Sequence, residues 1–100
     1  MERYRLSWVQ STSDFANSQD VQAVINGASA VPISVGQTMT VNQVTYDFPT
    51  GATVEWWIET TDDTGTKTVA SVHHTFTAQN EAPLEPATGL QATWVEHIPS

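Results

Sequence analysis

The feature that most constrains the fold of this chain is a repeated alternation of apolar and polar residues in short segments. Tyr4, Leu6 and Trp8 alternate with polar side chains, and the same alternation recurs along residues 53–60. A period of two is typical of a half-buried β-strand, because successive side chains of a strand point to opposite faces. No segment of the sequence shows the period of an amphipathic helix, about 3.6 residues. The alternation therefore predicts an all-β protein.

Turn signals separate the predicted strands. Asn26-Gly27 is a strong hairpin signal, because both residue types tolerate a positive φ. Turn-forming residues recur at 49–51 and at 62–65, and the polar run 10–19 predicts a loop. Pro32 has no N–H to donate, so we expect its strand at a sheet edge. Short strands separated by turns predict a single antiparallel β-sandwich of about seven strands.

Composition excludes several classes of function. The net charge is −8, with only three lysine and arginine residues, so the phosphates of nucleic acids would be repelled. No run reaches the roughly 18 apolar residues of a membrane span, and the first residues do not resemble a secretory signal. We therefore expect no nucleic-acid or membrane partner, and a location in the cytoplasm or release by cell lysis. The absence of cysteine excludes disulfides and thiol catalysis.

Two segments together resemble fibronectin type III domains, which belong to the immunoglobulin-like sandwiches. Residues 48–65 run from an apolar residue through a Pro-Gly turn and an alternating strand into an acidic loop that Gly65 closes. Arg5-Leu6-Ser7-Trp8 is similar to the second strand of that family, with its core Trp. The resemblance implies a sandwich over roughly residues 3–79. One departure is Val54, which stands where the family usually has a Tyr.

The C-terminal strand is the other departure from the family pattern. Residues 86–93, with Pro86 and Leu90, match the first strand of the family, which the resemblance implies should precede the second. We therefore expect a sandwich core at 1–80, a proline-containing linker at 81–88 and a C-terminal strand at 89–100.

That strand has two possible partners, an edge of its own sheet or an edge of a neighbouring molecule, and the sequence leaves both open. Burial of Leu90 and Trp94 would contribute roughly 3–6 kcal/mol by side-chain transfer values. The residues predicted to form this interface are Leu90, Ala92, Trp94 and Val95.

Trp57 is a second candidate contact site. By alternation it lies on the outer face of its strand, together with Glu55 and Glu59. An outward Trp is either covered by a neighbouring loop or takes part in a contact with a sugar or another protein. The sequence does not choose between these alternatives.

No pattern in the sequence predicts catalysis, a cofactor or a metal site. His73 and His74 are adjacent in a strand, so they point to opposite faces and cannot share one ion. The acidic residues around Asp62 and Asp63 do not have the spacing of a twelve-residue calcium loop. We find no arrangement of a nucleophile and a base, and we expect a protein that is not an enzyme.

The function we expect is that of a non-enzymatic structural or interaction protein. A virion component, such as a bacteriophage head decoration or tail protein, fits best, because sandwiches of this kind are frequent on phage surfaces. Its partners would be other protein subunits and its location the virion assembled in the host cytoplasm, with the cytoplasm as the alternative. The alternative function is a carbohydrate-binding or adhesive module that uses an exposed Trp and takes a glycan as partner.

Overall fold

The computed structural model describes residues 1–66, 68–79 and 89–99, and these residues form eight β-strands. The strands are β1 (Glu2–Ser7), β2 (Ala16–Ile25), β3 (Val31–Thr38), β4 (Gln43–Phe48), β5 (Thr53–Asp62), β6 (Thr68–Ala70), β7 (His74–Thr77) and β8 (Gln91–His97). The linker predicted at 81–88 lies outside the described residues.

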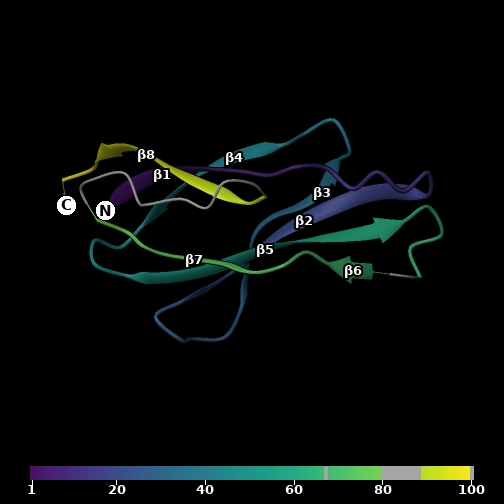
Figure 1. Cartoon of the computed structure of the whole chain (residues 1–100). Coiled ribbons are helices and arrows are strands. Elements are labelled where there is room, and N and C mark those ends of the chain that lie inside the picture. The colour runs from purple at the N-terminus through teal and green to yellow at the C-terminus, as the bar shows by residue number, and fades with distance from the viewer. Residues whose placement is uncertain (67, 80–88, 100) are drawn as a thin grey trace.

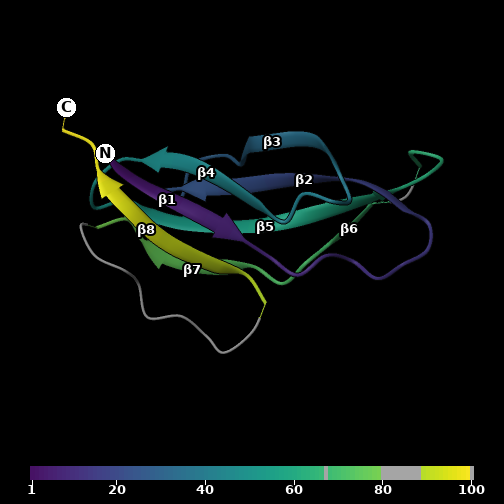
Figure 2. The same ribbon diagram turned by 90° about the horizontal axis from the view of Figure 1, so that it is seen from above.

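The strands form two antiparallel sheets that pack face to face (Figures 1 and 2). One sheet has the order β4-β1-β8, and the other has the order β3-β2-β5-β6, with β7 also paired to β5. The prediction of an all-β antiparallel sandwich is confirmed. The expected location of Pro32 is confirmed as well, because β3 is an edge strand of its sheet.

The number of strands is eight rather than about seven because the last strand of the larger sheet is interrupted. β6 ends at Ala70 and β7 begins at His74. Between them, Ser71 bonds to Ile58 of β5 partly through its side chain. The N–H of Ser71 donates to the carbonyl of Ile58 at 2.8 Å, and its hydroxyl accepts from the N–H of Ile58 at 2.9 Å.

The loop predicted at 10–19 is partly wrong, because β2 begins at Ala16. The segment Ala16–Gln19 pairs with the far end of β5, where Gln19 lies opposite Thr60. The polar side chains of this segment gave no strand signal in the sequence, although the segment continues the sheet.

The hairpin signal after β2 is confirmed. Asn26 and Gly27 have φ values of 55° and 73°, and the N–H of Ala28 closes the turn on the carbonyl of Ile25 at 3.2 Å. The side-chain oxygen of Asn26 also accepts a hydrogen bond from the N–H of Thr53 at 2.9 Å, which ties this turn to the start of β5.

The core between the sheets is apolar and rich in aromatic rings. Its largest fully buried apolar side chains are Trp56, Tyr4, Phe48, Leu6, Val21 and Val54. The Tyr4 hydroxyl crosses from one sheet towards the other and donates to the carbonyl of Gln79 at 2.8 Å. This bond links a hydroxyl to the backbone even though Val54 occupies the position where the family resemblance implies a Tyr.

Candidate interface at the C-terminal strand

The C-terminal strand β8 lies antiparallel to β1 of the same chain. Opposed pairs include Leu6 with Ala92, and Tyr4 with Trp94, before the register shifts between Arg3 and Tyr4. The shift leaves Val95 as an extra residue on β8, as in a β-bulge. Of the two partners that the sequence left open, the structure places β8 on its own molecule.

The four predicted interface residues have different environments. Leu90 and Ala92 are 7% and 1% exposed and belong to the core, and Trp94 is half-buried against it. Val95, on the bulge, is 44% exposed. The structure therefore brings three of these residues onto the core, while Val95 faces solvent.

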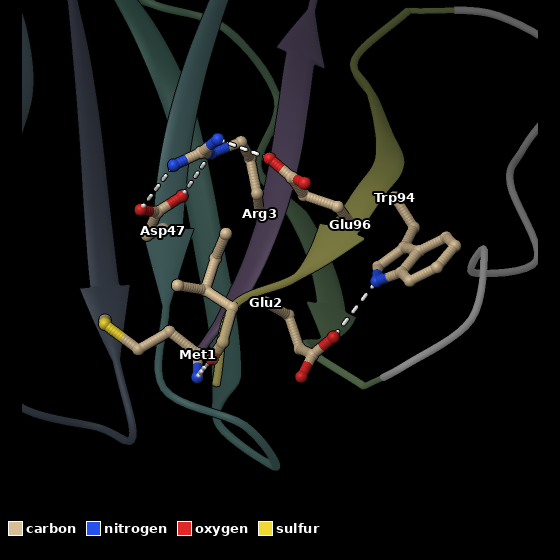
Figure 3. A network of polar contacts seen from close by, with 7 residues as sticks. Met1, Glu2, Arg3, Asp47, Trp94 and Glu96 are labelled. Atoms are coloured by element: carbon tan, nitrogen blue, oxygen red, sulfur yellow. Dashed lines mark hydrogen bonds and ion pairs between the residues drawn. The ribbon is translucent and has the colours of Figure 1, made fainter. Parts of the chain in front are cut away.

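A buried carboxylate, Glu2, joins β8 to β1 (Figure 3). The Glu2 side chain is 0% exposed. Its Oε1 accepts a hydrogen bond from Nε1–H of Trp94 at 3.0 Å, and its Oε2 accepts one from the Thr50 hydroxyl at 2.8 Å. Nδ1 of His97 also contacts Oε2. A buried charge is tolerated only when it is paired and hydrogen-bonded, and Glu2 meets this condition through two residues of β8.

The hydrogen bonds to Glu2 decide its ionisation state. Burial raises the pKa of the Glu2 carboxyl, but hydrogen bonds from His97, Trp94 and Thr50 outweigh burial and lower the pKa to about 2. The carboxyl is therefore ionised at neutral pH, and in the folded chain Trp94 and His97 of β8 supply two of the three contacts that stabilise its charge.

A second set of contacts lies on the outer side of the same strands. Arg3 donates from Nε to Asp47 on β4 at 2.8 Å and also pairs with Glu96 on β8 (Figure 3). The hydrogen bond from Arg3 lowers the pKa of the Asp47 carboxyl, and Arg3 thereby links all three strands of this sheet. Beyond β8, Met1 and Ile98 exchange backbone hydrogen bonds of 2.8 and 2.7 Å.

Glu2 was missed by sequence reasoning although a signal was present. Glu2 has the same phase as Tyr4, Leu6 and Trp8 in the alternation, so its side chain had to face inward. An acidic residue at an inward position of a strand requires buried partners. His97 carried no comparable signal, because its proximity to Glu2 depends on how β8 is placed.

Trp57, the other predicted contact residue, is largely covered. It is 9% exposed, and its ring stacks on the imidazole of His73 with centroids 4.2 Å apart and an angle of 9° between the planes. Its Nε1–H donates to Glu59 at 2.9 Å, while Glu55 contacts Nδ1 of His73 at 3.1 Å. The structure therefore brings Trp57, Glu55 and Glu59 together around His73, with little of the indole open to a ligand.

The two adjacent histidines point to opposite faces, as alternation requires. His73 lies on the outer face with Trp57, whereas Nδ1 of His74 accepts a hydrogen bond from the core residue Trp56 at 2.9 Å. Among residues 1–66, 68–79 and 89–99, no three acidic or histidine side chains gather closely enough to hold a metal ion.

A shallow hollow of about 210 Å³ lies between the start of β8 and β6. It is lined by Val9, Ser11, Ile58, Thr60, Val69, Ala70, Ser71 and Leu90. Its lining combines apolar side chains with the hydroxyls of Ser11, Thr60 and Ser71. Within the described part of the chain, no helix is long and apolar enough to cross a membrane.

Comparisons of the chain with models of protein families, with curated proteins and with solved structures found no match.

Proposed function

We propose that this chain is a non-enzymatic structural protein that joins subunits by exchanging its C-terminal strand. The observation that carries the proposal is the way β8 is held. β8 is an edge strand that supplies Leu90 and Ala92 to the core and two hydrogen-bonding partners to Glu2. The same contacts form whether β8 comes from the same molecule or from a neighbour, which is the condition for strand exchange between identical subunits.

The resemblance to fibronectin type III domains supports this proposal. If β1 corresponds to the second strand of that family, β8 occupies the place beside it that the resemblance gives to the first strand. A strand at the end of the sequence is suited to linking copies. It can pair with β1 of another copy while the strands β1–β7 of each copy stay in place.

The setting we propose is a virion, in which the chain serves as a bacteriophage head decoration or tail protein. The support is the analogy with sandwiches on phage surfaces, together with an acidic chain in which no catalytic arrangement was found. A carbohydrate-binding role gains no support from the structure, because His73 covers the ring of Trp57.

Strand exchange can be tested by disulfide trapping, since the chain has no cysteine of its own. Arg5 on β1 and Thr93 on β8 are directly opposed, and Cα atoms of opposed strand residues lie within disulfide range. Purified Arg5→Cys and Thr93→Cys variants are mixed at high concentration and oxidised. We expect covalent heterodimers, because one molecule's β8 then lies on the other molecule's β1.

The control mixes Arg5→Cys with Thr12→Cys, because Thr12 is an exposed loop residue. The yield of heterodimers in this mixture measures disulfides formed by random collision. Heterodimers no more abundant than in this control would refute strand exchange. The double variant, with both cysteines in one chain, shows in parallel whether the disulfide forms within a single molecule.

A further inference from the structure

The four strand edges of the sandwich are not equally protected against pairing with another molecule. β3 contains Pro32 and two register shifts, and β8 contains the bulge at Val95. β6 and β7 have only three and four residues. Prolines, bulges and short strands are the usual devices that prevent edge pairing. β4 has none of them: its six residues keep one register with β1 from end to end.

The backbone groups of β4 that point away from β1 can be identified. The N–H of Trp8 donates to the carbonyl of Asn42 at 3.1 Å, and this pair continues the β1–β4 register. Hydrogen-bonded and non-hydrogen-bonded pairs alternate in an antiparallel ladder, so Val44, Tyr46 and Phe48 bond to β1. The N–H and C=O groups of Gln43, Thr45 and Asp47 therefore point outward, on the side where the described residues pair no strand with β4.

We propose that β4 pairs antiparallel with β4 of a second copy of this chain, about a two-fold axis at Thr45. The proposal goes beyond strand exchange, because it uses the edge of the sheet opposite to β8 (Figure 2). The pairing would join the two three-stranded sheets into one continuous sheet, with Gln43, Thr45 and Asp47 of each copy making the new backbone hydrogen bonds.

The side chains of β4 are complementary to themselves in this register. Thr45 faces Thr45, and Gln43 faces Asp47 on the outer side, where the Gln43 amide is a donor for the carboxylate. Asp47 is the only charged residue of β4 and is already paired with Arg3. On the inner side, Val44 faces Tyr46, and both are partly buried hydrophobic residues.

Charge does not oppose a second copy at this edge. The chain carries a net charge of −8, so copies repel one another over most of their surface. Residues 21–46 contain no Asp, Glu, Lys, Arg or His, and this segment includes β3 and most of β4. Two acidic copies therefore meet little repulsion along β3 and β4, and of these two edges only β4 is free of a proline and of register shifts.

The test compares two lysine substitutions that are matched in environment. Thr45 on β4 and Thr77 on β7 are both exposed threonines of edge strands, and Thr77 lies outside both proposed interfaces. Sedimentation velocity of the full chain should show a dimer whose dissociation constant rises about tenfold or more in Thr45→Lys, because two lysines then face each other across the axis. Thr77→Lys, with the same change of charge, should dimerise like the parent.

Amide hydrogen exchange supplies a second readout and a check of the fold. As the protein concentration rises, the amides of Gln43, Thr45 and Asp47 should become protected, whereas that of Tyr46 should be protected throughout. A monomer at every accessible concentration, equal weakening by both lysine variants, or no added protection of Thr45 would overturn the proposal. Disulfide trapping between positions 5 and 93 above its control, combined with no added protection of Thr45, would overturn β4 pairing and leave strand exchange standing.

Discussion

The indole Nε1–H of Trp94 donates a 3.0 Å hydrogen bond to the buried carboxylate of Glu2. This bond joins residues 92 positions apart in the sequence and connects β8 to β1 at the level of the core. It couples the position of the C-terminal strand to the stability of a buried charge, because moving β8 away would remove the partners that Trp94 and His97 provide.

Replacing Trp94 by Phe should destabilise the protein by about 1–3 kcal/mol, because a buried acceptor loses its donor. Phe keeps an aromatic ring but is smaller than the indole, so the loss of packing is judged from the same change at Trp57. The measurement is urea unfolding, with a lower midpoint and an unchanged m-value. Trp57→Phe is the matched control: it removes an indole donor from Glu59, a half-buried acceptor, and should cost less. Equal losses in the two variants would contradict this role of Glu2.

Acid should weaken the fold through Glu2. Folding lowers the pKa of its carboxyl from 4.5 to about 2, so the folded state binds a proton less readily than the unfolded state. The stability contributed by the charged form is present above pH 4.5 and is lost as the pH falls towards 2. Urea midpoints measured between these pH values should therefore decline.

The Glu2→Gln variant should show a flatter decline over the same range. That variant retains Asp47, whose pKa is also lowered by its hydrogen bond with Arg3. Asp47 therefore accounts for the part of the decline in urea midpoint that remains as the pH falls. An identical pH profile for parent and variant would show that Glu2 does not change its ionisation on folding.

Truncation of Leu90 should cost about 2–5 kcal/mol, as is usual for a buried leucine replaced by alanine. Leu90 is 7% exposed and packs in the core just before β8. Val95→Ala, on the exposed bulge of the same strand, should change the free energy of unfolding by no more than about 0.5 kcal/mol. Thermal and urea unfolding of both variants measure the difference. A negligible effect of Leu90→Ala would mean that β8 does not complete the core.

The sandwich was predictable because its main signals are local. Alternation along β1 and β5 assigns Tyr4, Leu6 and Trp56 to the core, and the positive φ of Asn26 and Gly27 follows from residue type alone. Hydrophobic burial and turn chemistry act within a few residues of the chain, so the sequence displays them directly.

The contacts around Glu2 and Gln19 were not predictable in detail because their partners lie far away in the sequence. Glu2 depends on residues of β8, and Gln19 depends on Trp8, Thr38 and the backbone of Val41. A polar side chain looks the same in the sequence whether it faces water or a set of buried partners. The predicted loop at 10–19 was wrong over residues 16–19 for this reason, since these residues belong to β2 and Gln19 is 1% exposed.

Replacing Gln19 by Ala should therefore be among the most damaging single changes to a polar residue in this chain. Its Oε1 accepts from Nε1–H of Trp8 at 3.0 Å, and its Nε2 donates to the carbonyl of Thr38 at 2.9 Å. Trp8 would lose its acceptor at a buried site and the Thr38 carbonyl would lose its donor at a partly buried one, so we expect a loss of about 2–5 kcal/mol in the free energy of unfolding. Gln22→Ala is the control, because Gln22 is a half-buried residue of the same strand, opposite Trp57. Urea unfolding should show Gln22→Ala within about 0.5 kcal/mol of the parent, and comparable losses for the two variants would contradict the role assigned to Gln19.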